Sequence, residues 1–107
     1  MTITLRNPFP EDNYDLSKKT PTFIINGYKL YLTCYACPEQ YDVLDRDNNM
    51  VAYFRLRHGV FTVSYPDVGG EIIYRAFPRG DGAFVEEEQI PELTKAILAI
   101  EEHTAQL

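Results

Sequence analysis

Two cysteines three residues apart, Cys34 and Cys37, form a C-x-x-C pair in the segment CYACP. Such a pair can act as a redox dithiol or supply two of the four ligands of a zinc ion. Redox chemistry favours a first thiol at a helix N-terminus, but the following residues, PEQYDV, are typical of a strand. Zinc needs two more ligands, and the only histidines, His58 and His103, belong to no second paired motif. Cys34 and Cys37 are therefore weak metal candidates; we expect two small packed thiols and no metal or cofactor.

Two other short motifs resemble known sites but lack what the chemistry requires. The segment DRDNN, beginning at Asp45, starts like a calcium loop, yet Met50 and Leu56 occupy the positions that need Gly and Glu. Arg79-Gly80-Asp81 spells an adhesion tripeptide and is more simply a flexible turn. No phosphate-binding glycine loop, nucleophile elbow or H-E-x-x-H is present. Without a triad or a pair of acids, the sequence predicts a protein that is not an enzyme.

Arg55 and Arg57 are two residues apart in an alternating segment, so in a strand they would share one face. Guanidinium groups bind carboxylates and phosphates through two parallel hydrogen bonds, and an adjacent Tyr can stack on a ligand. The alternative is a solvated face on which Asp42 and Glu71 pair with the arginines across the strands. The candidate binding residues on this face are Tyr53, Arg55, Arg57, Thr62, Ser64 and Arg75.

The segment that must position these residues is Val51–Tyr65, which predicts a β-hairpin around His58-Gly59. Gly59 adopts a positive φ without steric cost, and a two-residue turn sets Arg57 opposite Val60. Alternation then separates an apolar face from the face that carries the arginines. The apolar face, which we expect in the core, consists of Ala52, Phe54, Leu56, Phe61, Val63 and Tyr65.

Two further strand pairs are predicted before this hairpin. Asn26-Gly27 is a strong signal for a tight turn and predicts a hairpin within Thr22–Thr33. Gln40–Leu44 predicts a strand that pairs with Val51–Arg57 across the loop Asp45–Met50. In that register Tyr41 and Val43 join the core face.

After the central hairpin the sequence predicts one more strand and a helix. A turn at Pro66–Gly70 leads to a strand over Glu71–Ala76, with Ile72, Tyr74 and Ala76 facing inward and Ile73 and Arg75 outward. A helix is expected from about Pro91 to His103 because Pro suits a first helical turn. Apolar residues at helical spacing form one stripe: Ile90, Leu93, Ile97 and Ile100.

These elements predict an α+β fold: a mostly antiparallel β-meander of about five to six strands, with one C-terminal amphipathic helix packed on one sheet face. At 107 residues the chain is expected to form a single domain over residues 1–107. Prolines and turn-forming residues make residues 6–21 a loop or flexible arm within that domain.

Charge and composition exclude several classes of function. The net charge of −6 argues against nucleic-acid binding, which needs Lys and Arg to neutralise phosphates. No apolar run is long enough to span a membrane and no secretory signal is recognisable. Two cysteines without such a signal fit a reducing cytoplasm.

The sequence therefore predicts a small cytoplasmic interaction module without catalysis, of the inhibitor, adaptor or mobile-element accessory type. It would bind a partner protein or self-assemble into an oligomer, since Tyr and Arg are favoured at interface centres. The chain contains eight Tyr and six Phe, more aromatic surface than one helix on one sheet covers easily. The alternative is a protein that binds a small anionic ligand, such as a nucleotide, through the arginine and tyrosine face.

Overall fold

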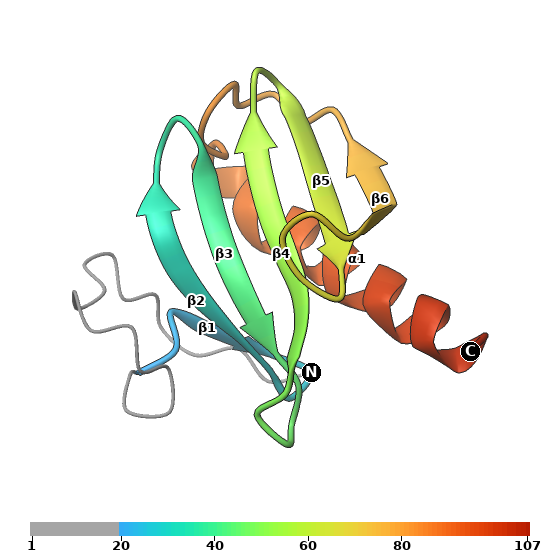
Figure 1. Cartoon of the computed structure of the whole chain (residues 1–107). Coiled ribbons are helices and arrows are strands. Elements are labelled where there is room, and N and C mark those ends of the chain that lie inside the picture. The colour runs from blue at the N-terminus through green and yellow to red at the C-terminus, as the bar shows by residue number, and fades with distance from the viewer. Residues whose placement is uncertain (1–19) are drawn as a thin grey trace.

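The computed structural model describes residues 20–107, and the predicted arm over residues 6–21 falls almost entirely outside them. Six strands form one sheet in the order β1-β2-β3-β4-β5-β6, with every neighbouring pair antiparallel. Figure 1 shows the twisted sheet with α1 packed behind it. The predicted α+β meander with a C-terminal helix is confirmed. The elements are β1 (Phe23–Ile25), β2 (Tyr28–Tyr35), β3 (Glu39–Leu44), β4 (Met50–Arg57), β5 (Val60–Tyr65), β6 (Glu71–Ala76) and α1 (Glu86–Ala105).

Both predicted tight hairpins form, and the β4–β5 hairpin has the predicted register. In the β4–β5 hairpin Arg57 lies opposite Val60, and His58 and Gly59 have φ values of 54° and 76°. Asn26-Gly27 joins β1 to β2 in the same way, with φ values of 54° and 85°. Two consecutive positive φ values are what a type I′ turn requires, and this turn matches the natural twist of the strands.

A single cluster of buried side chains from β1 to β5 and from α1 forms the core. Phe54 is fully buried in this cluster, and its ring makes edge-to-face contacts with two other rings. The distance between ring centroids is 6.5 Å to Tyr41 and 5.6 Å to Phe61. The predicted core face of the central hairpin is correct, except that Tyr65 is only half-buried. The helix contributes Leu93, Ala96, Ile97 and Ile100. One sheet face is therefore covered by α1, which leaves the opposite face to be considered for binding.

The prediction for Ile72 and Ile73 was wrong. Ile72 is 43% exposed, whereas Ile73 packs against the core. A β-bulge is the reason: Ser64 lies opposite Ile72 and Val63 opposite Tyr74, so Ile73 is the extra residue between them. After the bulge the side chains of β6 again point to the predicted faces, and Arg75 lies opposite Thr62 on the outer face.

The predicted start of the helix was also wrong, because α1 begins at Glu86 and Pro91 lies inside it. The Glu88 side chain accepts a hydrogen bond from the Val85 backbone N–H at 3.0 Å, which closes the first turn in the manner of a capping box. The negative charges of three glutamates in that turn also interact favourably with the positive end of the helix dipole, which stabilises the helix. No helix within residues 20–107 is long and apolar enough to cross a membrane.

Candidate functional site

The sheet face opposite α1 carries all six predicted binding residues, and we call this set, Tyr53, Arg55, Arg57, Thr62, Ser64 and Arg75, the arginine face. Arg55 lies opposite Thr62, and Thr62 lies opposite Arg75 on the next strand. Arg57 follows Arg55 by two residues in β4 and shares its face. Directly opposite residues in antiparallel strands have Cβ atoms about 4.5–5.5 Å apart. The fold therefore places Arg55 and Arg75 on either side of Thr62, two strands apart, on the same face as Arg57.

None of these three arginines has an ion pair with a carboxylate within the described part of the chain. Arg55, Arg57 and Arg75 are all exposed. Glu71, one of the carboxylates that could have paired with them, lies 4.0 Å from the His103 imidazole instead. The cross-strand pairs of the solvated alternative are thus not formed, and three guanidinium groups face outward together.

The other members of the arginine face are less accessible. Tyr53 is half-buried, and its hydroxyl donates a hydrogen bond to Gln40 Oε1. Burial raises the pKa of the Tyr53 hydroxyl, and the nearby Arg55 charge offsets this only in part. Ser64 is 7% exposed and offers little contact area. The three exposed arginines are therefore the groups through which this face can bind a partner or a ligand.

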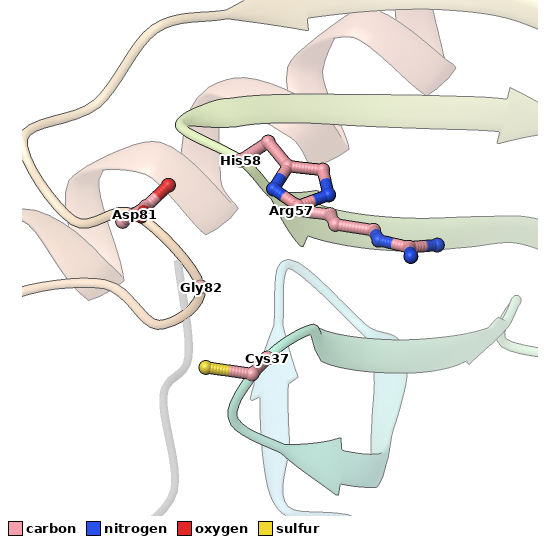
Figure 2. Close-up of a pocket in the computed structure, with 5 residues that line it drawn as sticks. All are labelled: Cys37, Arg57, His58, Asp81 and Gly82. Atoms are coloured by element: carbon pink, nitrogen blue, oxygen red, sulfur yellow. The ribbon is translucent and has the colours of Figure 1, made fainter.

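A second feature lies at one end of the sheet, where a cleft of about 240 Å³ opens between three chain connections. We call it the turn cleft; Figure 2 shows it with the His58 ring on one side and the Cys37 side chain on the other. Asp81 and Gly82 lie on the loop between β6 and α1, and the Arg57 side chain runs along β4. The lining residues are Cys37, Arg57, His58, Asp81 and Gly82. Arg57 thus belongs both to the cleft and to the arginine face.

The loop between β6 and α1 is docked on both turns by backbone hydrogen bonds. The Gly82 carbonyl accepts from the Cys37 and Glu39 N–H groups, both at 2.8 Å, and the Asp81 carbonyl accepts from the Gly59 N–H at 2.8 Å. A Cβ atom on Gly82 would stand 2.9 Å from the Cys37 Cα. This close backbone approach therefore depends on glycine at position 82.

Two carboxylates hold the rest of this loop. Glu88 accepts from the backbone N–H groups of Arg79 and Gly80, both at 2.8 Å, as well as from Val85. Burial disfavours the charged form of Glu88, but these donors outweigh it and lower the pKa of its carboxyl.

The second of these carboxylates, Glu39, is 2% exposed and accepts from the Phe84 N–H at 3.0 Å and from Gln89 Nε2 at 2.9 Å. The Tyr41 hydroxyl donates a third hydrogen bond to the same carboxylate. A buried network in which the polar groups have hydrogen-bond partners holds its side chains in one position. Glu39 therefore ties β3 to the loop at Phe84 and to α1 at Gln89, and the cleft wall is held in place before any ligand binds.

The two cysteines differ from the expected pair of packed thiols. Cys34 is half-buried and donates a weak hydrogen bond to the Ala36 carbonyl at 3.3 Å, whereas Cys37 is exposed; both thiols are free. The prediction of a packed thiol is thus wrong for Cys37, because its turn leaves it at the surface of the cleft. Within residues 20–107 no three His, Cys, Asp or Glu side chains gather as metal ligands.

Sequence reasoning considered Cys37, His58 and Asp81 separately and did not bring them together. No short spacing connects them, since they come from three different connections. The available signal was the predicted topology, because every second connection of a meander lies at the same end of the sheet. The β2–β3 turn, the β4–β5 turn and the loop after β6 meet for that reason.

Comparisons of this chain with protein-family models, with curated proteins and with solved structures give no match.

Proposed function

We propose that this protein is a small cytoplasmic interaction module without catalysis, which binds an acidic segment of a partner protein on its arginine face. The observation that carries the proposal is the group formed by Arg55, Arg57 and Arg75. These arginines are exposed on one sheet face without a carboxylate partner among the described residues, in a protein of net charge −6. Carboxylates of a partner would relieve the repulsion between the three cations.

The chemistry of this surface favours a protein partner. A guanidinium group binds a carboxylate through two hydrogen bonds, and Arg is enriched where interfaces are buried. Apolar side chains are exposed close by: Ile72 lies opposite Ser64 and is 43% exposed, and Phe77, directly after β6, is 74% exposed. A surface that combines arginines with scattered apolar groups suits an acidic segment with apolar residues of its own.

A small anionic ligand, such as a nucleotide, remains the alternative, and Tyr53 is the residue that would stack on its base. That side chain is half-buried and its hydroxyl is held by Gln40, which limits the ring area that it can offer. Small-molecule sites are also usually concave, whereas these residues stand on one face of an open sheet. Calorimetric titration with nucleotides tests this alternative directly.

A second copy of the chain is a further occupant that the experiment must distinguish. Glu86 and Glu87 at the start of α1 are exposed and could supply the carboxylates. Light scattering of the purified protein over a range of concentrations reports such self-association. Native mass spectrometry of the protein isolated from its host reports a different partner.

The decisive variants are Arg55→Gln and Arg75→Gln, made separately so that the turn cleft keeps Arg57. Each should weaken the complex about tenfold or more, which corresponds to about 1.4 kcal/mol, because one bidentate contact is lost. Lys95→Gln is the matched control, since Lys95 is an exposed cation on α1 outside both sites. A complex that both arginine variants bind as tightly as the unmodified protein would refute the proposed role of this face.

A further inference from the structure

The turn cleft contains four polar side chains that the fold does not use. The Cys37 thiol, the Arg57 guanidinium, the His58 imidazole and the Asp81 carboxylate make no side-chain hydrogen bond or ion pair within residues 20–107. All four are exposed, so water meets their hydrogen-bonding groups until a ligand displaces it. In this cleft the backbone, rather than these side chains, holds the walls together.

The described lining of the cleft combines one permanent cation, Arg57, with one carboxylate, Asp81. The His58 imidazole offers hydrogen-bonding nitrogen atoms, and Arg55 adds positive charge from the same strand face. The Asp81 carboxylate can accept a hydrogen bond but not donate one. A ligand that satisfies all of these groups has an anionic oxygen for the cations and a hydrogen-bond donor for Asp81.

The size of the cleft restricts the ligand further. Its volume of about 240 Å³ is below the roughly 300–1,000 Å³ of sites for drug-sized molecules. At about 30 Å³ for each water molecule, it holds the equivalent of about eight waters. A small ion or a small organic acid fits this space.

We propose that the turn cleft is a binding site for a small oxyanion, a phosphate or a carboxylate that also carries a hydrogen-bond donor. Arg57 is its cationic contact, the His58 imidazole is a hydrogen-bonding contact, and the Cys37 thiol lies beside it. Hydrogen bonds of Gly82, Glu39 and Glu88 hold the loop of the cleft in place. Little conformational entropy is therefore lost when the anion binds. This site shares Arg57 with the arginine face, whereas Arg55 and Arg75 do not line the cleft, so their variants test partner binding without removing the anion contact.

The exposed Cys37 thiol provides a direct measurement. Its thiolate displaces iodide from iodoacetate or iodoacetamide, forming one C–S bond as the C–I bond breaks. Iodoacetate is anionic and iodoacetamide is its neutral counterpart, so the ratio of the two rates reports attraction of anions into the cleft. The thiolate fraction cancels from this ratio. Cys34→Ser in all proteins leaves Cys37 as the reporter and keeps a donor for the Ala36 carbonyl.

In this background Arg57→Gln should lower the ratio of the iodoacetate rate to the iodoacetamide rate by about threefold or more, because the local positive potential falls. Lys95→Gln, which removes the same charge from α1, should leave the ratio unchanged. An unchanged ratio in Arg57→Gln would overturn the site.

Competition then identifies the anion. Inorganic phosphate and glycolate, a small carboxylate with a hydroxyl donor, are added separately at constant ionic strength, with chloride as the reference, while the alkylation of Cys37 by iodoacetamide is followed by mass spectrometry. Saturable protection by phosphate assigns a phosphate ligand, and saturable protection by glycolate assigns a carboxylate. The absence of saturable protection by either anion would overturn the proposal.

Discussion

Phe54 and Arg55 are consecutive residues of β4 with opposite environments. The Phe54 side chain is fully buried between the rings of Tyr41 and Phe61, whereas Arg55 is exposed on the other face without an ion pair among the described residues. Consecutive residues of a strand point to opposite sides of the sheet. The stability of the fold and its proposed binding therefore depend on different, alternating residues of the same strand.

Replacing these two residues should separate stability from binding. Phe54→Ala should lower the free energy of unfolding by about 3–5 kcal/mol, because it removes a buried ring and leaves a cavity. Arg55→Gln should change it by less than about 1 kcal/mol, as expected for an exposed charge. Urea unfolding followed by far-UV circular dichroism measures both. A destabilising Arg55→Gln together with a harmless Phe54→Ala would show that the two faces of β4 have been exchanged.

At the level of elements, the loop between β6 and α1 depends on one glutamate. Glu88 belongs to the first turn of the helix, and its two carboxylate oxygens accept from the N–H groups of Arg79, Gly80 and Val85. One side chain thus starts the helix and folds the preceding loop towards the turn cleft. The helix begins at Glu86, ahead of Pro91, because this arrangement stabilises its first turn.

Glu88→Gln should lower the free energy of unfolding at neutral pH by about 1–2 kcal/mol, because an amide has one acceptor oxygen for three N–H donors. The lowered pKa of Glu88 gives the effect a pH dependence. Its stabilisation is fully present above the ordinary carboxyl value of 4.5 and is lost as the pH falls through the lower value of the folded state. The difference between the two proteins should therefore shrink on acidification.

Thermal unfolding at a series of pH values measures this difference. Glu87→Gln is the control, because Glu87 is exposed and its partner among the described residues is the exposed Arg79, at 3.5 Å. It should have little effect at any pH. A Glu88→Gln protein as stable as the unmodified protein at neutral pH would exclude this role of the carboxylate.

At the level of the whole molecule, one core joins nearly all of the described elements. The buried cluster combines side chains of β1 to β5 with Leu93, Ala96, Ile97 and Ile100 of α1, and β6 packs against it through Ile73, Tyr74 and Ala76. Asn26 Nδ2 also donates to Glu101 Oε1 at 2.8 Å, which ties the first hairpin turn to the end of the helix. Neither the helix nor the sheet has an apolar interior of its own.

We therefore expect the sheet and the helix to unfold in one transition. Tyrosine fluorescence, which reports mainly on the strands, and far-UV circular dichroism, which reports mainly on α1, should give the same midpoint in urea. Ile97→Ala should lower both midpoints together, since Ile97 is 1% exposed in the shared core. Loss of the helical signal ahead of the tyrosine signal would contradict this expectation.

The sequence by itself determined the features that depend on neighbouring residues. Alternation along Val51–Tyr65 assigned Phe54 to the core and Arg55 to the outer face, and the turns at Asn26-Gly27 and His58-Gly59 set the register of two hairpins. These features follow from the period of a strand and from φ at two consecutive residues. The α+β class followed from the strands together with one amphipathic helix.

Only the tertiary structure decided the features that join distant residues. The bulge at Ile73 returns Arg75 to the outer face, and no local pattern indicates at which residue of β6 it falls. The start of α1 depends on donors from a loop that precedes it. Cys37, His58 and Asp81 share a cleft because the meander brings three connections to one end of the sheet and Gly82 lets their backbones meet. Such contacts depend on how whole elements pack, so they appear only once the chain is folded.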